Sequence, residues 1–127
     1  MALIDLDRAH GPFDFVLREV VRGSVTWEYT VDPAHFNPNG ALHGGVLMAL
    51  LDTAMGHAVS EVVVPQGRIN VAAQLNINFL VPIRSGTIRA TGTIVKMGKR
   101  MAIAEGRAVD DSGTLVGVAT STHSLLP

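Results

Sequence analysis

The stretch of sequence that decides the fold is Gly44–Ser60, GGVLMALLDTAMGHAVS. Its apolar residues are spread around nearly the whole circumference of a helix instead of forming one stripe, and a helix of that kind is buried on all sides. The rest of the chain is therefore expected to surround it. The apolar residues are Val46, Leu47, Leu50, Leu51, Ala54, Met55, Ala58 and Val59.

On both sides of this helix, apolar and polar residues alternate with a period of two, which is typical of half-buried β-strands. The pattern predicts an α+β fold, a long antiparallel β-sheet wrapped around one central apolar α-helix, in a single domain over residues 1–127. The expected strands are Ser24–Val31, Ile69–Val81, Thr87–Met97, Met101–Val109 and Thr114–Ser124, with a further strand within Phe13–Val21.

The composition adds a second expectation, because 47% of the 127 residues are hydrophobic and only 17% are charged. A small domain has little interior relative to its surface, so this much apolar side chain is hard to hide in one copy. We expect the surplus to face a partner subunit, a ligand tunnel, or both.

The same composition disfavours several classes of function. A net charge of -1 argues against a nucleic-acid partner, and the lack of cysteine excludes disulfides and thiolate chemistry. The histidines at positions 10, 35, 43, 57 and 123 have no close pairing of the kind that binds a metal. The longest apolar run, Val46–Leu51, is shorter than the roughly 20 residues that span a membrane, and Met1–Gly11 does not read as a signal peptide. We expect a cytoplasmic protein that needs no metal or other cofactor.

Asp52 is the most informative single residue, because it lies inside the apolar helix and far from its first turn. An ionised carboxylate is costly to bury unless it is paired, and no Lys or Arg occurs between His43 and Gln66. Such surroundings raise the pKa of a carboxyl group and suit it to act as a general base or a nucleophile. The alternative is that Asp52 reaches solvent or bonds a neighbouring strand.

A second motif, His43-Gly44-Gly45, stands directly before the helix. Two glycines leave backbone N–H groups uncovered at a helix end, where the helix dipole favours negative charge, so the motif can polarise a carbonyl or serve only as a tight entry to the helix. Gly44 and Asp52 are eight residues apart, about 12 Å along the axis, so one chain does not easily place both on one carbonyl. A two-fold dimer would bring Asp52 of one copy opposite Gly44 of the other.

Two sets of polar residues are weaker candidates. Asn37 can orient a substrate or a water, or can belong only to an Asn-Pro turn, and Asn76 and Asn78 can do the same or form a solvated sheet face. Lys99 and Arg100 lie at a turn, where they can hold a phosphorylated carrier or be solvated.

The helix itself holds two further residues of interest. Gly56 follows Asp52 by four residues and leaves a gap on the same helix face, suited to packing or to substrate. His57 is rotated away from that face, so we expect it to be structural.

Four motifs occur in order along the chain: NPNGALHGG at Asn37–Gly45, DTA at Asp52–Ala54, NINFLVP at Asn76–Pro82 and GKR at Gly98–Arg100. Together they resemble the hotdog-fold acyl-CoA thioesterases, and within them the phenylacetate-pathway (PaaI-like) and 4-hydroxybenzoyl-CoA-thioesterase-like group. The likeness covers about Asp14–Ser124.

The resemblance implies a homodimer that pairs its sheets edge to edge, a homotetramer built from two such dimers, and an acyl-CoA substrate bound at the dimer interface without a cofactor. By position, Asp52 would be the catalytic carboxylate and the Gly44 N–H would bind the thioester oxygen. Asn37 would position the carbonyl or the water, and His43 would shape the loop. The expected substrate contacts are Gly45, Gly56, Asn76, Asn78, Lys99 and Arg100.

The chain departs from the resemblance at Ala72 and Gly56, near which some relatives carry a hydroxyl group that assists the attacking water. A hotdog dehydratase or hydratase and a non-catalytic acyl-CoA-binding module are the alternative functions. The acyl group is expected to be small and aromatic or of medium chain length. Its tunnel would depend on side chains such as Met48, Met55, Phe79 and Leu80.

Overall fold

The computed structural model of the protein describes residues 11–127. His10 and the first ten residues of the expected domain lie outside the described residues. One six-stranded sheet is present, in the spatial order β1-β2-β4-β5-β6-β3, and every pair of neighbours is antiparallel. The strands are β1 (Val16–Val21), β2 (Ser24–Thr30), β3 (Ile69–Phe79), β4 (Thr87–Met97), β5 (Met101–Val109) and β6 (Leu115–Leu126).

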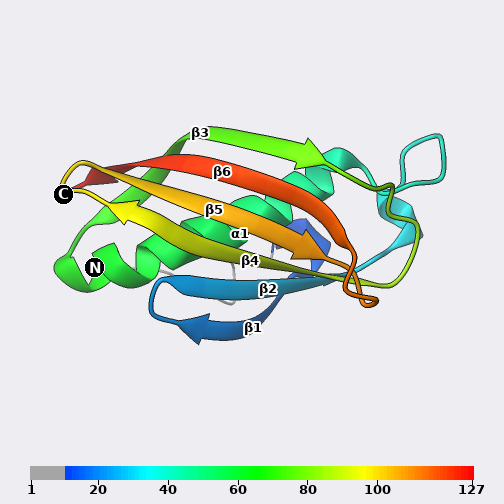
Figure 1. Ribbon diagram of the computed structural model, residues 1–127, viewed down its shortest axis with the longest axis horizontal. Helices are drawn as coiled ribbons and strands as arrows, with labels where there is room; N and C mark the ends of the chain where they lie inside the picture. Colours follow the sequence, from blue (N-terminus) through cyan, green and yellow to red (C-terminus); the bar gives the residue numbers. More distant parts are fainter. Residues whose placement is uncertain (1–10) are drawn as a thin grey trace.

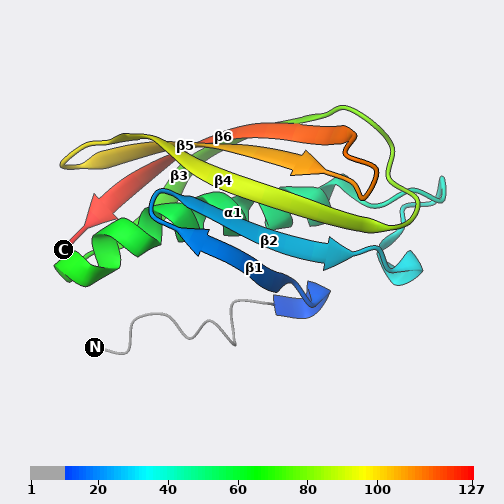
Figure 2. The same cartoon turned by 60° about the horizontal axis from the view of Figure 1, so that its bottom comes forward.

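The central helix α1 (Gly44–Val63) lies along one face of the sheet, as Figures 1 and 2 show. Three short 3-10 turns complete the described chain, at Gly11–Phe13, Pro33–His35 and Val64–Gln66. This arrangement confirms the predicted α+β fold, with a long antiparallel sheet around one apolar helix.

The element bounds agree closely with the sequence pattern. Strands β4 and β5 have the predicted bounds, and α1 begins at Gly44 as predicted and continues three residues beyond Ser60. The expected strand within Phe13–Val21 is shorter than the range suggested, because Phe13 belongs to a 3-10 turn and Asp14 has a φ of 54°. The chain therefore turns before β1 can begin.

Strand β3 departs from the predicted alternation. A bulge between Ala72 and Gln74 shifts the pairing with β6 by one residue, and such a shift exchanges the two faces of a strand. Asn70 consequently points toward α1, while Ile69 and Val71 are exposed. The reading of Ile69–Val81 as one continuous apolar face is therefore wrong for its first half.

The helix packs directly on the backbone of the sheet at β4 and β5. A Cβ atom at Gly92 would lie 2.4 Å from the carbonyl group of Ala54 and 2.5 Å from Cα of Met55. A Cβ atom at Gly106 would lie 2.9 Å from Leu51 Cδ2. These two glycines let α1 approach closely, and they fix the height of the Asp52 helix above the sheet.

Replacing Gly92 by Ala is expected to lower the free energy of unfolding by about 3 kcal/mol, because the new methyl group would overlap helix backbone that cannot rotate away. Urea denaturation measures this effect. Gly45→Ala is the opposite case, because nothing lies within 4 Å of its Cβ position, and a gain of up to about 1 kcal/mol is expected. A Gly92→Ala protein as stable as the wild type would contradict this packing.

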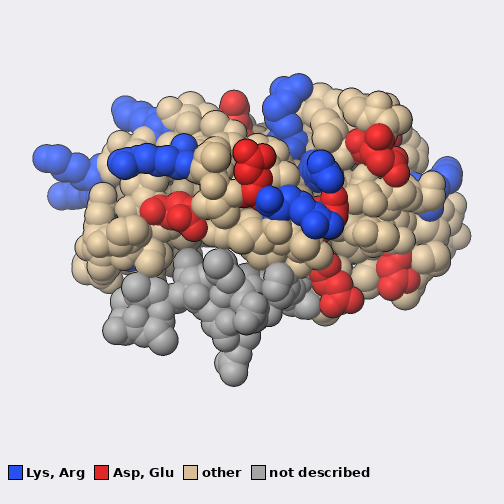
Figure 3. Space-filling view, turned by 90° about the horizontal axis from the view of Figure 1, so that it is seen from below, with Lys and Arg blue, Asp and Glu red and all other residues tan. Residues whose placement is uncertain are grey.

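The opposite face of the sheet carries charged side chains that pair locally. Glu28 of β2 accepts hydrogen bonds from Arg89 Nε, at 2.8 Å, and from Arg18, and these guanidinium groups lower the pKa of Glu28. Figure 3, seen from below and so from the β1 edge of the sheet, shows acidic and basic side chains interspersed along that edge. Acidic and basic side chains thus neutralise each other in this region, and they do not form a surface patch of a single charge.

Within residues 11–127, one helix is long and apolar enough, by length and composition, to cross a membrane: Gly44–Gln66, with a mean hydropathy of 1.4. The longest uninterrupted apolar run within this helix, Val46–Leu51, is much shorter. Burial of α1 against the sheet accounts for its apolar composition, since Leu50, Leu51 and Met55 are fully enclosed.

Candidate functional site

A cavity of about 510 Å³ opens at the start of α1. Two segments form its walls: the loop that leads into the helix and the chain that follows β3. Asn37, His43 and Gly44, three of the four predicted catalytic residues, line it together. Phe79, Leu80, Val81 and Arg84 also line it.

The loop that carries Asn37 is held by its own hydrogen bonds. The Asn37 side-chain oxygen accepts from the N–H of Asn39 at 2.9 Å and from the N–H of Ala41 at 3.2 Å. The loop is also bonded to the segment that follows β3, because the N–H of Leu42 donates a hydrogen bond to the carbonyl of Ile83 at 2.7 Å. Asn37 therefore shapes the loop with its oxygen, as the turn interpretation expected, and also borders the cavity.

Gly44 presents backbone to the cavity. His43 occupies the position before α1 without a side-chain hydrogen bond to the helix end, and the first N–H groups of a helix have no partner within it. Across residues 11–127, no acceptor is found for the N–H groups of Gly44 and Gly45. A Cβ atom at Gly44 would lie 2.9 Å from Phe79 Cζ, so the lack of a side chain lets the Phe79 ring lie against the helix end.

Asp52 lies half-buried in the third turn of α1 and, among the described residues, its side chain has neither a hydrogen-bond donor nor an ion-pair partner. Burial raises the pKa of the Asp52 carboxyl, and the charge of nearby His123 opposes that rise in part. This agrees with the inference that no residue of the helix pairs with the negative charge of Asp52. A carboxyl group in this condition is a stronger base than an exposed one.

The side of α1 that carries Asp52 is left open by the sheet. Phe79 at the end of β3 contacts Gly44, and Asn70 near its start donates to the carbonyl of Gly56 at 3.1 Å, so the stripe around Asp52 runs beside β3. The sequence pattern predicted burial on all sides, and this stripe is the exception. Its exposed or half-buried residues are Gly45, Met48, Ala49, Asp52, Thr53 and Gly56.

Asp52 does not line the Gly44 cavity of its own chain. The two residues are about 12 Å apart along the helix axis, as the spacing predicted. The described chain thus holds two separate features, an open carboxylate at Asp52 and a cavity lined by Gly44.

Asn76 and Asn78 are separated from both Asp52 and the Gly44 cavity. They line a shallow hollow of about 230 Å³ on the outer face of the sheet, together with Glu105 and Arg107 of β5. Side chains alternate along a strand, so the inward position of Leu75 and Ile77 sends these asparagines outward. Within one chain they contact neither Asp52 nor Gly44.

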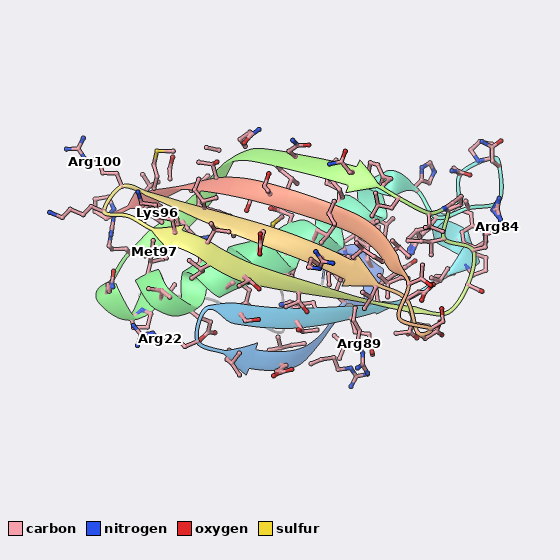
Figure 4. All side chains as sticks on the ribbon, in the orientation of Figure 1. Arg22, Arg84, Arg89, Lys96, Met97 and Arg100 are labelled. Carbon is pink, nitrogen blue, oxygen red and sulfur yellow. The ribbon has the colours of Figure 1, made fainter. Side chains whose placement is uncertain are left out.

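Lys99 and Arg100 are also remote from the cavity. They follow β4, whereas Arg84 precedes it, and eleven strand residues span about 36 Å. Figure 4 shows Arg100 and Lys96 at one end of the molecule and Arg84 at the other. Among the described residues that line the Gly44 cavity, the Lys or Arg side chain is that of Arg84, in the segment between β3 and β4.

Two of the helix residues have structural positions. Met55 is fully buried and packs near Gly106 of β5, so it does not face a partner copy or a tunnel as the sequence analysis expected. His57 accepts from Trp27 Nε1 at 3.0 Å and contacts Glu61 at 2.8 Å, which agrees with its predicted structural role. Met48, Phe79 and Leu80 are exposed and remain candidates to line the acyl site.

Comparison with known proteins places this geometry in a family. A profile described as the thioesterase superfamily matches residues 39–117. The chain belongs to this superfamily. It has the hotdog fold, and its similarities fall in the PaaI-like group.

Three similar proteins illustrate the relationship. Acyl-coenzyme A thioesterase 13 of Mus musculus is 33% identical over 98 residues, covering 72% of this chain and 69% of the mouse protein. A phenylacetic acid degradation-related protein of Ralstonia eutropha is 29% identical, with a TM-score of 0.85 over 97% of this chain and 92% of that one. The BH2602 protein of Bacillus halodurans, solved with CoA, is 34% identical, with a TM-score of 0.75 over 80% of this chain and 66% of that one.

Several curated relatives are longer than the matching region. The chain spans about half the length of three relatives that carry esterase names, from 51% to 54%. The superfamily match therefore describes the domain that these proteins share.

Proposed function

We propose that the protein is an acyl-CoA thioesterase that works as a homodimer, with Asp52 of one chain and the Gly44 N–H of the other acting on the same thioester. The observation that carries this proposal is the pair of incomplete half-sites, one an uncompensated carboxylate on an open helix face and the other a cavity with free N–H donors. The name of the mouse relative and the CoA bound to the Bacillus halodurans protein support this substrate class.

The proposed reaction needs only these groups, because a thioester is already an activated acyl group. Asp52 takes a proton from water as the water oxygen attacks the carbonyl carbon, and the Gly44 N–H stabilises the negative oxygen that forms. The carbon–sulfur bond then breaks, the thiolate takes up a proton, and free acid and CoA are released. A nucleophilic Asp52 would instead form an acyl anhydride, which mass spectrometry of rapidly quenched enzyme would detect as an acyl adduct on Asp52.

The unpaired edge of β3 supports the proposed assembly. It is the last strand of the sheet, 11 residues long, and it carries exposed Ile69, Val71 and Phe79 without a single charged residue. Such an edge readily pairs with another strand. Pairing with a second copy there would cover the open stripe of α1 beside it and bring the Asp52 of each copy toward its partner. Light scattering would distinguish this dimer from a tetramer of two dimers.

The decisive experiment is a thiol-release assay with a panel of aryl-CoA and medium-chain acyl-CoA substrates. We expect release of free CoA from at least one class, with the small aromatic class as the first to test. Hydration of an enoyl-CoA without thiol release would support the dehydratase alternative. Tight acyl-CoA binding without turnover would support a binding module.

Asn37→Asp tests whether Asn37 acts on the substrate as well as on its loop. The carboxylate keeps an oxygen for the N–H groups of Asn39 and Ala41, so the melting temperature should stay near that of the wild type. It also puts negative charge beside the Gly44 cavity, so kcat/KM should fall about tenfold. Asn37→Ala is the matched variant, and it should lower the free energy of unfolding by about 1 kcal/mol. Unchanged kcat/KM in Asn37→Asp would limit Asn37 to shaping the loop.

A further inference from the structure

A cluster of polar side chains lies buried between α1, β3 and β6, beside the otherwise apolar core. His123 and Ser121 are each 1% exposed, and Ser60 is also buried. Buried polar groups cost free energy unless they bond one another. We call these residues, with Asn70, the His123 cluster. The catalytic scheme above uses none of the four.

Hydrogen bonds fix the orientation of each member of the His123 cluster. Ser60 Oγ donates to Asn70 Oδ1 at 2.7 Å, and Asn70 Nδ2 approaches His123 Nδ1 at 3.4 Å. An amide nitrogen can only donate, so Nδ1 is the acceptor of the ring and the hydrogen is on Nε2. His123 Nε2 then donates to Ser121 Oγ at 2.8 Å. When the imidazole is neutral, these bonds therefore hold it in one tautomer.

The edge of this imidazole faces the gap beside Asp52. Gly56 lies one helical turn after Asp52, and the nearest atom to a Cβ at Gly56 would be His123 Cε1, at 3.9 Å. Ala72 is directly opposite His123 in the pairing of β3 with β6. Gly56 and Ala72, neither of which carries a hydroxyl group, both border His123.

Electrostatic interaction also links His123 with Asp52. Burial lowers the pKa of His123 and raises the pKa of Asp52, and in each group the charge of the other opposes the effect of burial. Among the titratable groups of residues 11–127, Asp52 is the one whose charge acts on His123. Asn70 of β3 and Ala102 of β5, which pack beside the ring from the neighbouring strands, carry no charge.

We propose that His123 is a positioning residue for Asp52, a ring that the His123 cluster fixes beside Gly56, one helical turn from the carboxylate. The inference rests on the proposed function, in which Asp52 accepts the proton of the attacking water. The ring acts through Asp52 and does not contact the substrate. Because Asn70 also bonds the carbonyl of Gly56, the His123 cluster ties the open strand β3 to the helix that carries Asp52.

His123→Gln removes the imidazole and keeps a polar side chain for Ser121 and Asn70. Without the ring, the Asp52 carboxylate loses a charge that favours its ionised form, so the acidic limb of the kcat profile should move up by about half a pH unit or more. At the pH optimum kcat should fall about threefold to tenfold while KM stays constant. Steady-state hydrolysis of the best acyl-CoA from about pH 4.5 to about pH 9 measures both effects.

A titration of the Asp52 carboxyl carbon by NMR, in wild type and His123→Gln, tests the same inference without any substrate. The midpoint should rise in the variant. If the wild type hydrolyses no thioester but the Asp52 midpoint is still higher in His123→Gln than in the wild type, the proposed function is overturned. The link between Asp52 and His123 would then remain intact.

His57→Gln is the matched control, because His57 is also buried beside α1 but contacts Trp27 and Glu61. It should leave the pH profile and the Asp52 midpoint unchanged. His123→Phe is a second variant with an apolar ring, and it should reproduce the upward shift. If His123→Gln lowers only the melting temperature, with the acidic limb and the Asp52 midpoint as in the wild type, the His123 cluster is purely structural and the inference is wrong.

Discussion

Replacing Asp52 by Asn is expected to lower kcat for acyl-CoA hydrolysis at least about a hundredfold and to raise the melting temperature at about pH 7. The first effect follows because an amide cannot accept the proton of the attacking water. The second follows because burial raises the pKa of the folded carboxyl, so the folded chain binds its proton more tightly than the unfolded chain. That contribution to stability is present at acid pH and is lost as the pH rises through the folded pKa.

The gain in stability of Asp52→Asn should therefore shrink as the pH falls below the folded pKa of Asp52. Thermal denaturation of both proteins across this range measures it, beside the thiol-release assay. Asp111→Asn is the control, because Asp111 is an exposed carboxylate in the turn between β5 and β6. It should leave turnover unchanged. Full turnover in Asp52→Asn would remove Asp52 from the mechanism.

Much of the fold could be predicted from the sequence because each signal was local. The continuous apolar helix starts at the double glycine, and the turns at Gly98 and around Gly113 set the strand ends on either side. The hydrophobic periodicity of a helix or strand and the position of a turn depend on residues that are close together in the sequence. The bulge in β3 does not, because it is a property of the pairing with β6, and it alone decides that Asn70 faces the helix.

The candidate site was predictable in part for the same reason. The double glycine stands out in the sequence because it begins a helix without side chains. Asp52 stands out because it is a charged residue within an apolar run. His123 became visible only in three dimensions, because it lies on another strand, far along the chain from the helix residue Gly56 that it adjoins. Lys99 and Arg100 were grouped with the site by order along the chain, and the length of β4 separates them from the Gly44 cavity of their own chain.

Placing charge on the β3 edge is expected to produce a folded monomer with at least about a hundredfold lower turnover. Val71 is 48% exposed on this edge, and Gln74 follows the bulge. The double substitution Val71→Lys and Gln74→Lys puts four like charges into a two-fold interface, where desolvation makes each of them costly. Asp52 and Gly44 remain in place in each copy but no longer meet. Light scattering and the thiol-release assay, run on the same samples, measure the two effects together.

The opposite edge of the sheet supplies the matched control for the β3 prediction. Val16 and Val20 of β1 are 42% and 41% exposed, close to the value for Val71, and they lie on the far side of the sheet from α1's open stripe. Val16→Lys with Val20→Lys adds the same charge, and it should leave both assembly and turnover unchanged. If the β3 variant is monomeric and fully active, each chain contains a complete site. If it stays dimeric and active, the copies associate through another surface. Either result would contradict a site shared across the β3 edge, because such a site exists only while the two edges are paired.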